Sequence, residues 1–218
     1  MEREVILQQV AAEVAVCTRC ILHYSRKHAV PGEGRADAEI MFIGEGPGFY
    51  ENEQGRPFVG PAGKFLDELL QRAGLKREDV FITNVVKCRP PGNRDPQPEE
   101  LQACDVYLER QLQAINPRVI VTLGRFSMAK FLPNARISDV HGKAMWVNGR
   151  LIIPMYHPAA ALHQPTLKST VIEDFARLPE YLEMARKGQP TPDVHPTLEI
   201  QPEEPPTQDD TPTQLSLF

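Results

Sequence analysis

Four short apolar runs alternate with helical patterns along this chain, and that alternation limits the folds open to it. The runs are rich in β-branched or aromatic residues and are bounded by Gly, Pro or charged residues. They lie at residues 39–43 (EIMFI), 80–86 (VFITNVV), 118–123 (RVIVTL) and 151–156 (LIIPMY). Helical patterns lie at residues 62–73, 98–115, 125–131 and 167–186. Strands that alternate with helices predict a three-layer α/β/α fold with a central four-stranded, mostly parallel sheet.

Unusual polar residues follow three of these runs. The turn GEGPG at residues 44–48 follows the first, Asn84 lies late in the second, and His157 follows the fourth. Sheets of this kind bind ligands at the carboxyl ends of their strands. We therefore expect the three groups to meet at one site.

The chain divides into one domain and a tail. Its 218 residues, 41% of them hydrophobic, suffice for one domain with a closed core. We assign residues 1–188 to this domain. Residues 189–213 are rich in Pro and acid and predict a disordered linker, because they bury too little apolar surface to offset chain entropy. Residues 214–218 (QLSLF) form a short apolar end.

The formal net charge of −5 comes from the tail. The first 188 residues carry 24 basic and 23 acidic side chains, so a polyanionic partner is not excluded. No apolar run approaches the length of a membrane span, and the acidic, amphipathic start MEREVILQQV does not resemble a signal peptide. These features predict a cytoplasmic protein.

In the cytoplasm, cysteines are more often metal ligands or free thiols than disulfides. Cys17 and Cys20 form a C-x-x-C pair, while Cys88 and Cys104 flank a loop and the start of a helical pattern. Such a set suits a four-sulfur site for zinc or an iron–sulfur cluster, and the spacing does not separate the two. The alternative is a small buried Cys104 and an incidental Cys88 thiol.

The glycine turn alone indicates little. It completes neither the G-x-G-x-x-G fingerprint nor a phosphate-binding loop, and is typical of a tight turn that lets backbone approach a ligand.

Several motifs in order nevertheless resemble one family. The segments GEGPG, GRPFVGPAGKFLDELL, ITNVVKCRPPGNRDP and HPAA, with the four cysteines, are similar to family-4 uracil-DNA glycosylases, the iron–sulfur class, over about residues 14–186. The resemblance implies a monomeric base-excision-repair enzyme that flips uracil out of DNA and hydrolyses its N-glycosidic bond to leave an abasic site. It also implies that the cysteines hold a [4Fe-4S] cluster that organises the DNA-facing surface.

The resemblance assigns roles around the extruded uracil. Phe58 stacks on the base, and the Asn84 amide reads its O4 and N3–H edge. The turn residues Gly44 and Gly46 border the uracil. The structural alternative for Phe58 is an ordinary core phenylalanine, and the alternative for Asn84 is a cap at the end of a strand.

Two further residues would act on the bond. His157 stabilises negative charge on O2 of the leaving base, and Glu45 positions or activates the attacking water. Their structural alternatives are a histidine cap and a carboxylate that braces the turn.

One departure separates this chain from other uracil glycosylases. Their aspartate and thymine-excluding tyrosine correspond here to Gly46 and Gly48. We therefore expect Glu45 to activate water, and Glu51 or Tyr50 to exclude thymine.

DNA contacts are expected next to the site. Leu162 could wedge into the gap left by the flipped nucleotide, or lie on the apolar face of a helix. Lys87 and Arg89 are candidate phosphate contacts, or members of a solvated face.

The chain end resembles the Q-L-x-L-F peptide with which bacterial proteins dock on the DNA-polymerase sliding clamp. The matching residues are Gln214, Leu215, Leu217 and Phe218. A flexible tether would raise the effective concentration on DNA. The alternative is a frayed terminus.

Two other functions remain open on sequence. A relative of the family binds uracil-DNA covalently through a histidine in an Arg-rich insert. This chain has His141 in the corresponding region, without the basic insert. The second alternative function is that of a non-catalytic DNA-binding module that is tethered to the clamp.

Overall fold

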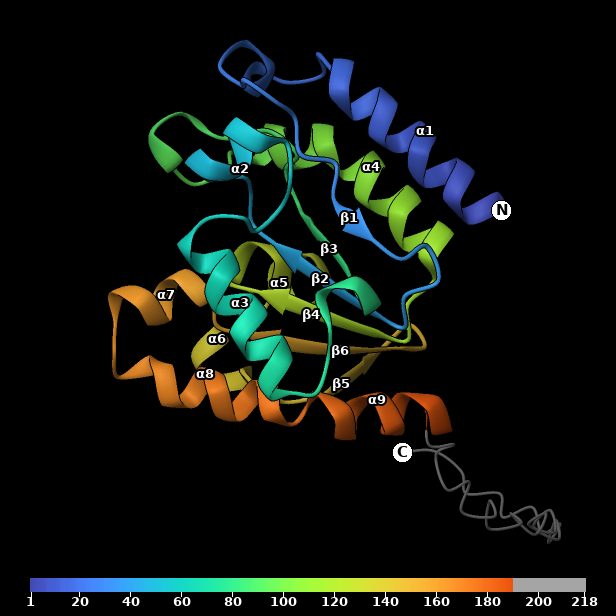
Figure 1. The fold of residues 1–218 in the computed structure, drawn as a ribbon, viewed down its shortest axis with the longest axis vertical. Coiled ribbons are helices and arrows are strands. Elements are labelled where there is room, and N and C mark those ends of the chain that lie inside the picture. Colours follow the sequence, from blue (N-terminus) through green and yellow to red (C-terminus); the bar gives the residue numbers. More distant parts are fainter. Residues whose placement is uncertain (190–218) are drawn as a thin grey trace, which may run out of the picture.

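The computed structural model describes residues 1–189, in which a six-stranded sheet lies between layers of helices (Figure 1). The strands are β1 (Glu33–Gly34), β2 (Ile40–Gly44), β3 (Phe81–Asn84), β4 (Val119–Leu123), β5 (Met145–Val147) and β6 (Arg150–Met155). The helices are α1 (Glu2–Val16), α2 (Phe49–Gln54), α3 (Pro61–Arg72), α4 (Pro98–Ile115), α5 (Arg125–Phe131), α6 (Ile137–Val140), α7 (Pro158–His163), α8 (Leu167–Ala176) and α9 (Leu178–Lys187). Short 3₁₀ helices lie at Ile21–Tyr24, Arg77–Asp79 and Pro91–Asn93.

The sheet confirms the predicted α/β class but has two more strands than expected. Its order is β1-β3-β2-β4-β6-β5, and the four inner strands pair in parallel. The outer strands β1 and β5 are antiparallel to their neighbours. With two and three residues, they are too short to show an alternation of apolar and polar residues in the sequence. The β5–β6 hairpin did leave a signal, because Asn148-Gly149 provides the two positive φ angles, 49° and 76°, that a two-residue hairpin turn needs.

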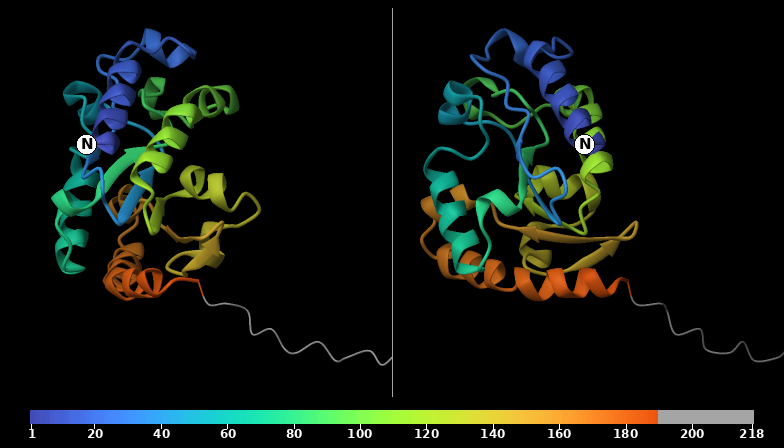
Figure 2. Two further views of the ribbon diagram at one scale, coloured as in Figure 1. Left: turned by 90° about the vertical axis from the view of Figure 1, so that its right-hand side faces the viewer. Right: turned by 45° about the vertical axis from the view of Figure 1, so that its right-hand side comes forward.

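Both faces of the sheet are buried, as the unbroken apolar runs predict. Along β2, Ile40 and Phe42 join one core with α3, α8 and α9, while Met41 and Ile43 join another with α4 and α5. Figure 2 shows α8 and α9 along one side of the molecule and α1 against α4 on the other. Helices on both faces leave the carboxyl ends of the strands free to form a site.

The predicted helix at residues 167–186 is two helices. α8 ends at Ala176, and α9 begins at Leu178 with Pro179 in its first turn. Proline lacks the N–H that a helix interior requires but is tolerated in a first turn, so the second helix starts there.

The predicted clamp-binding residues 214–218, and the predicted linker beyond residue 189, lie outside the described residues. Within residues 1–189, the helices are too short or too polar to span a lipid bilayer.

Candidate active site

The carboxyl ends of the inner strands meet at one edge of the sheet, beside α2, α3 and α7 (Figure 1). Gly44, the last residue of β2, pairs with Asn84, the last residue of β3, and His157 lies two residues beyond β6. A cavity of about 380 Å³ opens here. Its lining includes Glu45, Gly46, Glu51, Phe58, Asn84 and His157. The structure therefore brings the strand-end groups together, as the sequence pattern predicts.

Phe58 enters the cavity from an unusual backbone conformation. Its φ is 50°, in the left-handed region, which costs a residue with a Cβ about 1–2 kcal/mol. Arg77 Nη1 donates a hydrogen bond to the Phe58 carbonyl at 3.2 Å, and Nη2 donates to the Pro57 carbonyl at 2.5 Å. The backbone also passes close to Gly63, where an added Cβ would lie 1.9 Å from the Phe58 carbonyl oxygen. These contacts offset the unfavourable conformation and fix the aromatic face.

The Glu51 carboxylate braces the same loop from the other side. It accepts hydrogen bonds from the N–H groups of Val59 and Gly60, both at 2.9 Å, and from that of Gly48 at 3.1 Å. The last of these caps the start of α2. Glu51 thus joins the glycine turn to the Phe58 loop, and its predicted contact with the base stays a prediction.

Asn84 carries a polar atom without a partner. The side chain is 1% exposed, and within the described residues its Oδ1 accepts no hydrogen bond. Buried polar atoms are nearly always paired, so an unpaired one beside a cavity points to a ligand. Gly44 makes room for it, because a Cβ there would lie 2.4 Å from Asn84 Oδ1 and 2.7 Å from Phe58 Cζ. Gly44 lies behind the cavity wall and is absent from its lining, whereas Gly46 is part of the lining.

His157 caps the helix that follows it, and the cap fixes its tautomer. Its Nδ1 accepts a hydrogen bond from the Ala159 N–H at 3.1 Å, so the ring proton of the neutral imidazole lies on Nε2. Burial lowers the pKa of His157 to about 4. At neutral pH the ring is therefore an uncharged donor, stacked beside Phe58 with 5.5 Å between ring centroids.

Glu45 lines the cavity directly after β2. Burial, and then the negative charge of Asp95, raises the pKa of this carboxyl above its ordinary value. A carboxylate with a raised pKa is a better proton acceptor, which suits a general base.

The predicted phosphate contact by Lys87 is wrong. Its side chain is 1% exposed, and its Nζ donates to Thr83 Oγ1 at 2.5 Å, the Asn84 carbonyl at 2.9 Å and Gln111 Oε1 at 2.7 Å. Burial lowers its pKa to about 8. Lys87 supports the backbone of Asn84 from inside the protein and does not reach solvent.

The other predicted DNA contacts stay predictions. Leu162 is 44% exposed on the short helix after His157, and Arg89 is partly exposed after β3.

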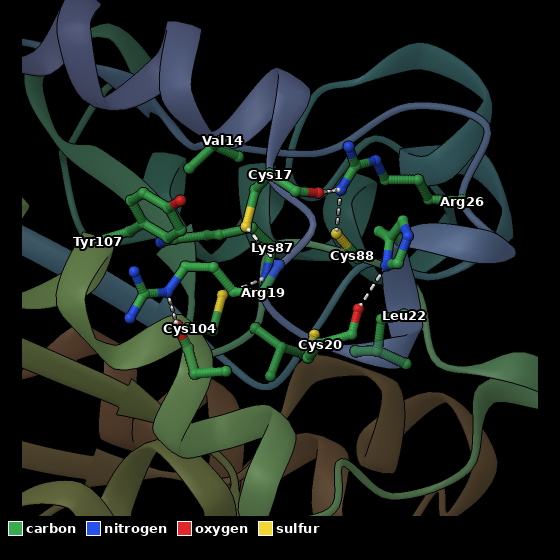
Figure 3. A pocket seen from close by; sticks show the side chains of 13 residues that line it. Val14, Cys17, Arg19, Cys20, Leu22, Arg26, Lys87, Cys88, Cys104 and Tyr107 are labelled. Atoms are coloured by element: carbon green, nitrogen blue, oxygen red, sulfur yellow. Dashed lines mark hydrogen bonds between the residues drawn. The ribbon is translucent and has the colours of Figure 1, made fainter.

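The four cysteines line one pocket, and Figure 3 shows their side chains around a shared space. Cys17 directly follows α1, Cys20 and Cys88 lie on loops, and Cys104 lies on α4. Three N–H groups donate to the sulfurs: Lys87 N–H to Cys104 at 3.2 Å, Arg26 Nη1 to Cys88 at 3.3 Å and Arg19 N–H to Cys17 at 3.5 Å. The thiols surround this pocket, and among residues 1–189 no three His, Cys, Asp or Glu side chains converge on a point for a single ion.

Sequence reasoning missed the residues that hold the loop. Arg77 lies in the segment LKREDV, which looks like an ordinary charged turn, and no local signal reveals its reach to Phe58. Asn93, which also lines the cavity, comes from a loop whose path depends on the tertiary structure.

The fold and site define a class of protein: within the described residues, it is an α/β/α protein with an aromatic face, an amide whose oxygen is unpaired and a neutral histidine at its strand ends. The model of the uracil DNA glycosylase superfamily matches residues 31–177, and this chain belongs to that superfamily.

Its relatives include a type-4 uracil-DNA glycosylase of Archaeoglobus fulgidus, 48% identical over 85% of this chain and 96% of the relative. The type-4 enzyme of Thermotoga maritima is 44% identical over 83% of this chain and 96% of the relative. A type-5 enzyme of Thermus thermophilus is 35% identical over 61% of this chain and 73% of the relative.

Proposed function

We propose that this chain excises uracil from DNA in base excision repair. It takes the uracil nucleotide out of the helix and hydrolyses the N-glycosidic bond, leaving free uracil and an abasic site. The observation that carries the proposal is the single cavity shared by Phe58, Asn84 and His157. The type-4 relatives support the choice of uracil.

The cavity suits a pyrimidine with the uracil edge. The Phe58 ring offers a stacking face, and the Asn84 amide offers an acceptor and a donor side by side. That pair matches N3–H and O4 of uracil and mismatches cytosine, which carries an amino group at C4. Discrimination by buried hydrogen-bonding groups is large, because the wrong base leaves them unpaired.

The bond breaks as negative charge develops on the departing base. Nε2–H of His157 donates to O2, where this charge collects, and loss of one such donor typically costs about 3 kcal/mol. Glu45 positions a water molecule and takes its proton as the water oxygen bonds to C1′ of the sugar. The proton thus goes to Glu45, and the bonding electrons leave with the uracil.

The cysteine pocket fits a [4Fe-4S] cluster held by Cys17, Cys20, Cys88 and Cys104. Support comes from an all-sulfur donor set that surrounds a space, with N–H groups directed at three of the sulfurs. Such a cluster would fasten α1 to α4 and to the loop after β3. The hydrolysis itself needs no electron transfer.

Incubation with a labelled uracil-containing oligonucleotide, followed by alkali cleavage, tests the proposal. Wild-type protein should release free uracil and leave an alkali-labile site, whereas Asn84→Ala and His157→Ala should lose most of this activity. Binding with the uracil still attached would favour a non-catalytic module instead.

A covalent uracil-DNA binder would give an adduct that survives denaturation. The structure gives this alternative little support, because His141 is absent from the cavity lining and its Nδ1 forms a 2.8 Å hydrogen bond with Asp174.

The remaining parts of the proposal concern partners and location. The protein acts as a cytoplasmic monomer on uracil-containing DNA, and residues 214–218 bind the bacterial sliding clamp through Gln214, Leu215, Leu217 and Phe218. Deletion of these residues should abolish clamp binding and spare activity on short oligonucleotides. Unchanged clamp affinity would refute the role of the tail.

A further inference from the structure

Two exposed aromatic side chains lie beside the cavity, and neither takes part in the proposed bond cleavage, although Tyr50 stays a candidate for excluding thymine. Phe49 is 53% exposed and Tyr50 is 49% exposed. They begin α2, between Gly48 and Glu51, which both line the cavity. Neighbouring large apolar side chains left in water indicate a binding surface more often than a packing role.

The two rings are held in a defined arrangement. Their centroids are 5.5 Å apart and their planes meet at 85°, the edge-to-face geometry that aromatic pairs favour. Tyr50 also packs on Gly60, where an added Cβ would lie 2.9 Å from Tyr50 Cδ2. The pair therefore adjoins the loop that carries Phe58.

A cation completes this surface. Arg89 Cζ lies 5.4 Å from the centroid of the Phe49 ring, and its Nε donates to Asn93 Oδ1 at 2.7 Å. Asn93 is neutral, and no carboxylate of residues 1–189 pairs with Arg89, so within the described residues the guanidinium charge is uncompensated. Arg94 differs, because the Glu100 carboxylate pairs with it through two hydrogen bonds of 2.9 and 2.6 Å. We call Phe49, Tyr50 and Arg89 the α2 ledge.

We propose that the α2 ledge binds the nucleotide next to the extruded uracil in the same strand. The flanking base or its sugar packs on Phe49, and Arg89 contacts the adjoining phosphate. An aromatic face with an uncompensated cation is the combination that proteins use to hold single-stranded nucleic acid. The ledge adjoins the cavity, because Gly48, Glu51 and Asn93 beside it line that cavity, and this favours the DNA strand over a separate protein partner. The inference rests on the proposed function, since the cavity must hold the extruded base.

A fluorescent flanking base tests the contact. The full-length protein is titrated against an oligonucleotide that carries 2′-fluoro-2′-deoxyuridine, which resists cleavage, and 2-aminopurine on its 5′ or 3′ side. Wild-type protein should change the 2-aminopurine fluorescence on one side. Phe49→Ala should abolish that change and weaken binding about 10-fold or more, within the range that loss of one base–aromatic stack spans. Phe49→Tyr keeps a ring and should restore both.

Two further variants complete the design. Arg89→Gln should reduce the slope of log Kd against log salt by about one phosphate contact. Met184→Ala is a matched control, since Met184 is 43% exposed on α9, and it should leave binding and fluorescence unchanged.

Separate outcomes overturn the ledge and the proposed function. The ledge proposal is overturned if Phe49→Ala binds the oligonucleotide and changes its fluorescence as wild-type protein does. It is also overturned if Phe49→Tyr loses as much binding and fluorescence change as Phe49→Ala. Uracil release by wild-type protein from an ordinary substrate is measured in parallel. Its absence would overturn the proposed function, whereas release together with an unaffected Phe49→Ala would overturn the ledge alone.

Discussion

Arg77 donates a hydrogen bond to the main-chain carbonyl of Phe58, and through it an ion-pair network supports the candidate stacking face. The same guanidinium pairs with Glu33 at 2.9 Å and Asp67 at 2.9 Å. Phe58 needs this support because its backbone lies in the left-handed region. The candidate stacking face thus depends on charges outside the cavity.

Replacement of Arg77 by alanine should weaken substrate binding. A hydrogen bond to a charged group contributes about 1.5–3 kcal/mol, so we expect kcat/KM on a uracil oligonucleotide to fall about 10- to 100-fold. Stacking acts on the ground state and the transition state alike, so most of the change should be in KM. Steady-state kinetics measure both parameters.

Arg56→Ala is the matched control for this experiment. Arg56 also pairs with Glu33, at 2.7 Å, but among residues 1–189 its side chain makes no hydrogen bond to the Pro57 or Phe58 carbonyl. An equal loss of activity in Arg56→Ala and Arg77→Ala would show that the ion pairs matter and the Phe58 carbonyl does not.

His157 should stay neutral throughout the physiological pH range. Burial holds its folded-state pKa at about 4, below the ordinary 6.5, so the unfolded chain binds more protons between those values. The free energy of unfolding should therefore fall as pH drops from 6.5 to 4, by at most about 3 kcal/mol. Denaturant titrations of wild type and His157→Gln at several pH values measure the free energy of unfolding. The variant should lose the part of the pH dependence that comes from His157. A His157 imidazole that titrates near 6.5 by NMR would contradict the assignment.

Gly44→Ala should damage the base site more than the fold. The added Cβ would lie within 3 Å of both Asn84 Oδ1 and the Phe58 ring, and overpacking of this kind costs about 1–3 kcal/mol. We expect a folded protein whose affinity for a 2′-fluoro-2′-deoxyuridine oligonucleotide falls at least 10-fold. Circular dichroism and binding titration measure the two effects, and wild-type affinity would show that the site adapts.

The sequence predicted the elements whose signals are local. The inner strands appear as apolar runs, and Asn84 and His157 follow from their place at strand ends. The edge strands β1 and β5 are too short to show an alternating pattern, and only the Asn148-Gly149 turn marks the β5–β6 hairpin. Lys87 was misassigned because a lysine gives no local sign of burial, and its partner Gln111 lies 24 residues away. Arg77 escaped notice for the same reason, since its contact with Phe58 depends on how the chain folds back.

Loss of a cysteine should remove iron and lower stability while sparing the chemistry. If Cys17, Cys20, Cys88 and Cys104 hold a cluster, Cys88→Ser should carry less iron and less visible absorbance than wild type. Metal binding is coupled to folding, so its loss removes folding free energy. A few kcal/mol in a domain of this size would lower the thermal midpoint by about 10 °C.

Glu45, Phe58 and His157 come from other segments of the chain than Cys88, so the folded fraction of Cys88→Ser should keep most of its kcat at low temperature. Lys87 limits this independence, because its N–H bonds to Cys104 while its Nζ bonds to the Asn84 carbonyl. Disturbance through Lys87 should therefore raise KM before it lowers kcat. Iron analysis, thermal melts and single-turnover kinetics separate these effects. A folded, iron-free variant with no single-turnover rate would show that the cluster does more than fasten the fold.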